Sequence, residues 1–106
     1  MSQMPSAGVA EPTSGPVFKF RLYVARDALN SVQAVANLNR FCREHLHDRH
    51  EIEIVDVFRE PRRALAEGVL MTPTLIKMAP APVRRIIGTL SQTATLVHAL
   101  GLEVDA

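Results

Sequence analysis

The pattern of residues 17–56 constrains the fold more than any other feature of the chain. It begins with "VFKFRLYV", in which apolar and polar residues alternate as in a strand with one buried face. Apolar residues then recur at helical spacing through about His45, and Asn30 and Ser31 are candidate N-cap residues for this helix. "EIEIVDVF" returns to the strand pattern. A strand, a helix and a strand of these lengths predict a right-handed crossover and a parallel strand pair.

Proline and glycine divide the second half of the chain into short elements. Pro61 and Gly68 frame a predicted helix over residues 61–67. The strand patterns "TPTLIKM" and "VRRIIG" lie on either side of "APAP", and Ser91 is a candidate cap for a last helix that ends at Gly101. The β-branched residues of this last segment also alternate well enough to form a strand. The full order, β-α-β-α-β-β-α, resembles the thioredoxin-like order and predicts a single α/β domain of that fold.

Length and composition fit one domain. The 106 residues are too few for two cores, and 47% of them are hydrophobic, which is near the average for globular proteins. Residues 1–16 are rich in Pro, Ser, Gly and Ala, so we expect a flexible tail before a domain that spans residues 17–106. The tail lacks the basic start and apolar region of a signal peptide, and no apolar run reaches the about 20 residues of a membrane span. We therefore expect a cytoplasmic protein.

The charge balance argues for a protein partner rather than a nucleic acid or a membrane. The net charge is +1, from 12 basic and 11 acidic residues, which is too even for a surface that binds either polyanion. Ten of the 12 basic residues are arginines, whose planar group suits carboxylates and protein interfaces.

Thiol redox chemistry is excluded despite the thioredoxin-like order. That chemistry needs a reactive thiolate at a helix N-terminus and a second cysteine two residues away. The corresponding loop reads "ARDALNS", and the only cysteine, Cys42, lies about three turns into the first helix on its apolar stripe. We expect Cys42 to be a buried, inert thiol.

The other candidate reactive groups also have simpler explanations. His45, His47 and His50 lack the spacing of zinc ligands and fit a solvated helix end, where the helix dipole favours a charged histidine. Glu51 and Glu53 share one face of a strand and fit an exposed sheet edge. Asp56 fits a paired carboxylate or a strand end, with a catalytic role as the minor alternative. The sequence therefore predicts no enzyme, no metal site and no cofactor.

Two pairs of arginines are the most noticeable polar features. Arg62 and Arg63 lie on the predicted short helix, and Arg84 and Arg85 lie within a strand, where adjacent side chains point to opposite faces. Together with Lys77 on the preceding strand, they fit either a solvated surface or a surface for an acidic protein partner. Both interpretations stay open at this point.

A resemblance to a known family favours the second interpretation. From Phe18 to Leu102 the chain resembles the KaiB family of circadian-clock proteins in one continuous register. The "TPTL" step alone is weak, but joined to "PVRRIIG" at this spacing it is specific. The segments that carry the resemblance are "FRLYVA", "NSVQAVANLNRF", "IEIVDV", "EP", "TPTLIK" and "PVRRIIGTLS".

The resemblance implies a binding protein without catalysis. KaiB proteins bind the N-terminal ATPase ring of KaiC, a hexameric ATPase and autokinase, and modulate its phosphorylation state and output. In cyanobacteria the assembly then captures KaiA and displaces a competing sensor histidine kinase. Lys77, Arg84 and Arg85 match basic positions of the family pattern, and with Arg62 and Arg63 they form the predicted partner-binding set.

The resemblance also implies fold switching. KaiB proteins exchange a thioredoxin-like state that binds KaiC for a self-associated state, a dimer or tetramer, in which the second half of the chain refolds. X-Pro bonds isomerise at a small equilibrium cost, so we expect Pro73, Pro80 and Pro82, together with Gly88, to belong to this conformational switch.

Some segments depart from the cyanobacterial pattern. "ARDALNS" replaces a loop with glycine, asparagine, threonine and proline, "GTLS" replaces "GDLS", and Gly68 replaces a lysine. These departures predict a non-cyanobacterial branch and argue against KaiA as a partner. The alternative function is a thioredoxin-like sensor or adaptor module that contacts a histidine kinase or another signalling protein.

Overall fold

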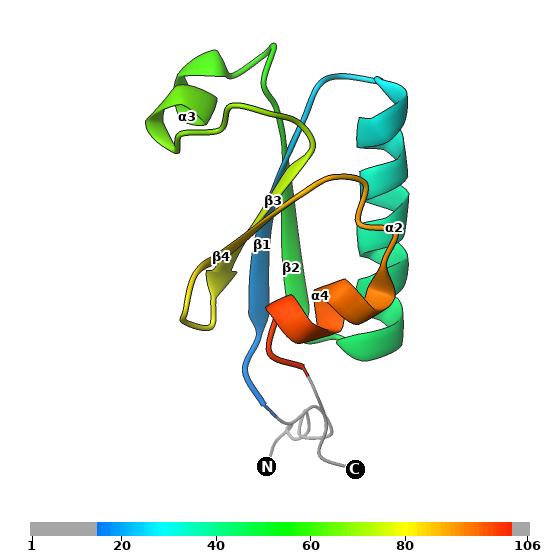
Figure 1. Cartoon of the computed structure of the whole chain (residues 1–106). Helices are drawn as coiled ribbons and strands as arrows, with labels where there is room; N and C mark the ends of the chain where they lie inside the picture. Colours follow the sequence, from blue (N-terminus) through cyan, green and yellow to red (C-terminus); the bar gives the residue numbers. More distant parts are fainter. Residues whose placement is uncertain (1–14, 103–106) are drawn as a thin grey trace, which may run out of the picture.

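The computed structural model describes residues 15–102, which form one four-stranded mixed sheet and three helices (Figure 1). The predicted tail over 1–16 therefore lies, apart from residues 15 and 16, outside the described part, as do residues 103–106 of the predicted domain. No helix within residues 15–102 combines the length and the apolar character needed to cross a membrane. In chain order the elements are β1 (Phe18–Val24), α2 (Leu29–His45), β2 (His50–Asp56), α3 (Pro61–Ala66), β3 (Thr74–Ala79), β4 (Arg84–Ile87) and α4 (Thr93–Ala99).

The sheet has the strand order β2-β1-β3-β4. β1 pairs with β2 in parallel, from Phe18 opposite His50 to Val24 opposite Asp56, which agrees with the predicted crossover through α2. β3 is antiparallel to both β1 and β4. β2 and β4 are the edge strands, so the acidic residues of β2 lie at an exposed edge as expected.

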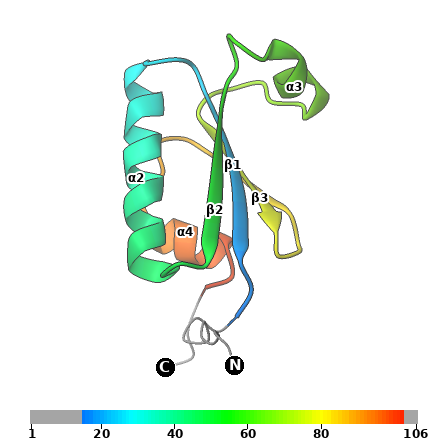
Figure 2. The ribbon, with the colours of Figure 1, turned by 180° about the vertical axis from the view of Figure 1, so that it is seen from behind.

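One face of the sheet carries the larger core. Alternate residues of β1, including Leu22, pack with the apolar side of α2, and Leu96 and Leu100 of the α4 region close the same cluster. Figure 1 and Figure 2 show α2 and α4 on the same side of the sheet in both views. The helical alternative for the last segment is therefore the one that forms, because its apolar side chains seal the end of this core.

The other face is covered only in part. α3 lies near the end of the sheet where β1 and β2 finish, and it packs through Ala64 into a small cluster with Tyr23, Val55 and Ile76. The remainder of this face carries no helix within the described residues (Figure 2). Several of its side chains are exposed, among them Lys19, Glu51 and Glu53. This uneven cover determines which polar residues can meet a partner.

The predicted helix caps are wrong. α2 begins at Leu29 with Ala28 as the N-cap residue, so neither Asn30 nor Ser31 caps it. Ser31 is buried, and its Oγ accepts a hydrogen bond of 2.9 Å from the backbone N–H of Ala25 in the β1–α2 turn. α4 follows Gln92 rather than Ser91, and neither helix has a side-chain cap.

Candidate protein-binding surface

The two neighbouring arginines of α3 have different surroundings. Arg62 is exposed and lines a shallow pocket with Arg59 and Pro61. Arg63 is engaged within the domain: its Nη1 lies 2.9 Å from Glu53 Oε2 and 3.2 Å from Glu60 Oε1. Arg63 lines the same pocket, but of the two arginines Arg62 is the more exposed.

An ionic cluster joins α3 to the sheet. Arg21 of β1 contacts Glu53 Oε1 at 2.9 Å through Nε and Glu67 Oε1 at 2.7 Å through Nη1. The hydroxyl of Tyr23 donates a hydrogen bond to the same Glu67 oxygen, and Arg85 of β4 donates to the backbone carbonyl of Glu67. Glu67 therefore receives donors from two strands, which positions the C-terminal end of α3.

The ion pairs shift the pKa values of both acids in this cluster. Hydrogen bonds from Arg63 and then Arg21 lower the pKa of Glu53 to about 2. Burial alone would raise the pKa of Glu67, but hydrogen bonds from Tyr23 and Arg21 outweigh it and lower that pKa. Both carboxylates are thus ionised at neutral pH and belong to the cluster rather than to proton-transfer chemistry.

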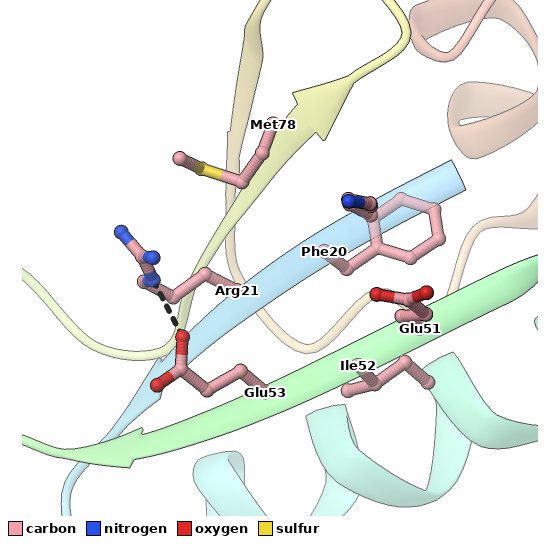
Figure 3. Close-up of a pocket in the computed structure, with 7 residues that line it drawn as sticks. Phe20, Arg21, Glu51, Ile52, Glu53 and Met78 are labelled. Atoms are coloured by element: carbon pink, nitrogen blue, oxygen red, sulfur yellow. Dashed lines mark hydrogen bonds and ion pairs between the residues drawn. The ribbon is translucent and has the colours of Figure 1, made fainter. Parts of the chain in front are cut away.

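A hollow lies beside this cluster on the open face of the sheet. It has a volume of about 390 Å³, and Figure 3 shows Arg21 and Glu53 joined at one end of it, with Met78 on the neighbouring strand. Lys19 and Glu51 complete its charged lining, so basic and acidic groups balance. Glu53, whose pKa is perturbed, is held ionised by its ion pair with Arg21, so it is not poised for proton transfer near neutral pH.

Arg84 and Arg85 are both exposed and point to opposite faces, as predicted. The β3–β4 register places Arg84 opposite Lys77 and Arg85 opposite Ile76. A residue that binds a partner is expected to be exposed, but Lys77 is only 3% exposed. It lies on the helix-covered face of β3, where its Nζ is 5.8 Å from the centroid of the Phe18 ring.

The residues expected to form the switch gather around β3 and β4. The peptide bonds that precede Pro73, Pro80 and Pro82 are all cis. The backbone N–H of Gly88 donates a hydrogen bond of 3.0 Å to the carbonyl of Pro73. Gly88 has φ 123°, a conformation that side-chain-bearing residues rarely adopt.

An exposed apolar strip next to Arg85 was not predicted. Two shallow pockets share Leu70 and Met71; one is also lined by Phe58, and the other by Arg85 and Ile87. Leu70 is 89% exposed, and Phe58, Met71 and Ile87 are each more than half exposed. We call these five residues the Leu70 surface. The only sequence signal for it is "GVLM", an apolar run between a glycine and a proline step, where a loop rather than a strand presents the side chains.

The Leu70 surface combines apolar and cationic groups. The guanidinium of Arg26, at the turn after β1, lies 5.3 Å from the centroid of the Phe58 ring, and Arg85 lies at the other end of the strip. Apolar centres that include methionine, aromatic and arginine side chains are typical of protein interfaces. Large exposed apolar patches on a small domain mark interaction sites.

The thiol and two of the histidines, His45 and His50, have structural contacts within the domain. Cys42 is fully buried, and burial raises the pKa of its thiol to about 12, so the reactive thiolate is not available at neutral pH. The His45 ring packs on Phe41 with centroids 4.6 Å apart, and His50 Nδ1 lies 3.1 Å from the carbonyl of Leu46. Among residues 15–102, no three histidine, cysteine or acidic side chains gather as metal ligands would.

A family model described as the KaiB domain matches residues 21–102. The chain belongs to the KaiB family. The circadian clock protein KaiB3 of Synechocystis sp. is 45% identical over 84 residues, which cover 79% of this chain and 80% of that protein. The circadian clock oscillator protein KaiB of Thermostichus vulcanus is 38% identical over 85 residues, covering 80% and 79%. The curated relatives named here are thus circadian clock proteins.

Solved structures confirm the thioredoxin-like fold of this KaiB-family chain. The N-terminal domain of Synechococcus elongatus SasA has a TM-score of 0.68 and 16% identity, covering 100% of this chain and 98% of that domain. Chloroplastic thioredoxin z has the same TM-score and identity, covering 81% and 77%. At this identity the likeness concerns the fold alone.

Proposed function

We propose that this protein docks on the N-terminal ATPase ring of a KaiC-type hexameric ATPase and changes its phosphorylation state and output. The match to the KaiB domain over residues 21–102 carries this proposal. The exposed apolar side chains of the Leu70 surface support it, because such side chains are typical of protein-binding sites. The buried thiol of Cys42 argues against redox chemistry as the alternative. The proposed place of action is the cytoplasm.

The Leu70 surface is the part of the molecule that we propose contacts the ring. Burial of its apolar strip against a partner would contribute favourable binding free energy of about 25 cal/mol per Å² of apolar area removed from water. Arg26 and Arg85 at its two ends favour acidic groups around a matching apolar patch on the partner. Arg62 adds a cation on the exposed side of α3.

The other members of the predicted partner-binding set take different places in this proposal. Arg63 holds α3 on the sheet and shapes the surface indirectly. Lys77 and Arg84 lie on the other face of the sheet, away from Leu70, so we leave them out of the proposed interface.

Size-exclusion chromatography with light scattering tests the proposal. The protein is run alone and with the KaiC homologue of its own genome in ATP, using phosphorylated and dephosphorylated KaiC. We expect co-migration with the hexamer in at least one phosphorylation state, while the free peak reports whether the protein is a monomer, a dimer or a tetramer. Separate peaks in every state would refute docking on KaiC.

The second candidate function is an adaptor that contacts a histidine kinase. The fold shared with the SasA N-terminal domain is compatible with it, but at 16% identity that likeness carries no partner. The 45% identity to KaiB3 favours the first proposal. A competition experiment on KaiC distinguishes the two functions. Under the first function, this protein and the thioredoxin-like domain of the kinase displace one another from KaiC; under the second, they do not.

A further inference from the structure

Two cations face each other across the β3–β4 hairpin. Lys77 and Arg84 are direct partners in the antiparallel register, so their side chains leave the same face of the sheet. Like charges directly opposite one another in a sheet are destabilising. Arg85, one residue further, leaves the opposite face and does not share this conflict.

The conflict is not relieved within the described part of the chain. Lys77 is 3% exposed, and its ammonium group has the Phe18 ring as its described neighbour. The ion pairs formed among residues 15–102 include neither Lys77 nor Arg84. Burial and the nearby Arg84 charge both lower the pKa of Lys77, which is the direction expected for an uncompensated cation.

The same two cations line a pocket between the hairpin and α4. Its volume is about 200 Å³, and none of the described residues that line it is acidic. Typical pockets for drug-sized ligands have volumes of about 300–1,000 Å³, so this one suits a smaller ligand. The lining consists of Lys77, Pro82, Arg84, His98, Ala99 and Gly101.

We propose that this pocket between the β3–β4 hairpin and α4 binds a small oxyanion of the phosphate class, held between Lys77 and Arg84. Such an anion supplies the negative charge that no described residue gives this like-charged pair, and the arginine group suits two oxygens of a phosphate at once. The site is independent of docking on KaiC, because it lies on the helix-covered face of the sheet and shares no residue with the Leu70 surface.

Titration with inorganic phosphate, followed by two-dimensional ¹H–¹⁵N NMR, tests this site. Sodium chloride at equal ionic strength is the reference, which separates binding from general salt effects. We expect saturable shifts of amide signals in β3, β4 and α4, and none in the middle of α2. Shifts that grow linearly without saturation, or that spread evenly over the molecule, would overturn the proposal.

Neighbouring arginines provide the matched variants. Arg84→Gln and Arg85→Gln remove the same charge from adjacent exposed positions, but only Arg84 lines the pocket. We expect Arg84→Gln to weaken phosphate binding about tenfold or more, as the loss of a charge-assisted hydrogen bond does, and Arg85→Gln to bind as the wild type does. Equal losses in the two variants would overturn the site. Lys77→Met, with its fold checked from the same spectra, is expected to lose binding as well.

Discussion

At the scale of single residues, side chains that look equivalent in the sequence have different contacts in the structure. Arg62 and Arg63 are neighbours of the same type, yet one is exposed and the other forms two ion pairs. Of the two acids that Arg63 contacts, Glu60 is a near neighbour in the sequence, but Glu53 lies on a different element, β2. No local pattern predicts such a pair, because it depends on where α3 crosses the sheet.

Removal of the Tyr23 hydroxyl is expected to destabilise the domain. Tyr23 is fully buried, and its hydroxyl donates to the ionised Glu67. A hydrogen bond to a charged group contributes about 1.5–3 kcal/mol, so Tyr23→Phe is expected to lower the free energy of unfolding by about that amount. Urea denaturation measures it, with Arg62→Gln as a surface control that changes it by less than about 0.5 kcal/mol. A Tyr23→Phe variant as stable as the control would show that this bond contributes nothing.

The ion pairs of Glu53 predict a pH dependence of stability. Its pKa is about 2 in the folded protein against an ordinary 4.5, so the folded state favours the ionised form. This contribution is present above pH 4.5 and is lost as the pH falls from 4.5 to about 2. We expect the urea midpoint of Glu53→Gln to fall less steeply than that of the wild type across this window. If the urea midpoints of the two proteins fell in parallel with pH, the ion pairs of Glu53 would not be the source of this pH dependence.

At the scale of elements, the sequence patterns predict the number, type and order of the helices and strands between residues 15 and 102. β1 and β2 follow from the alternation of apolar and polar residues in their first halves, and the bounds of α3 follow from Pro61 and Gly68 within one residue. The start of α2 could not be predicted from capping residues, because Ser31 bonds to the preceding turn instead. The burial of Lys77 was also missed, since it follows from the position of β3 between β1 and β4.

α3 is the element whose stability depends most on side-chain contacts. It has six residues, and isolated helices shorter than about 12–15 residues are marginal in water. We therefore expect Arg63→Gln, which removes its ion pairs with Glu53 and Glu60, to speed amide hydrogen exchange in α3 more than in α2. Arg62→Gln is the matched control and is expected to leave the exchange of α3 unchanged. Similar exchange in both variants would show that the ionic cluster does not hold this helix.

At the scale of the whole molecule, the two faces of the sheet have different proposed tasks. The face covered by α2 and α4 holds the main core and the proposed oxyanion site, whereas the end near α3 presents the Leu70 surface. Fold switching of the second half stays a prediction from the family resemblance. The resemblance correctly predicted the family, but it did not predict the Leu70 surface, because exposed loop side chains follow no period.

The affinity of two apolar-to-acidic variants for the KaiC homologue tests the central claim most directly. Leu70→Asp changes the 89% exposed side chain of the proposed interface, and Val83→Asp changes a 56% exposed one in the β3–β4 connection at the far end of the hairpin. Neither variant opens the core, so both are expected to fold. Isothermal titration with the KaiC ring should give an affinity for Leu70→Asp at least about tenfold below that of Val83→Asp, the loss expected for an interface anchor. Equal affinities in the two variants would contradict docking through the Leu70 surface.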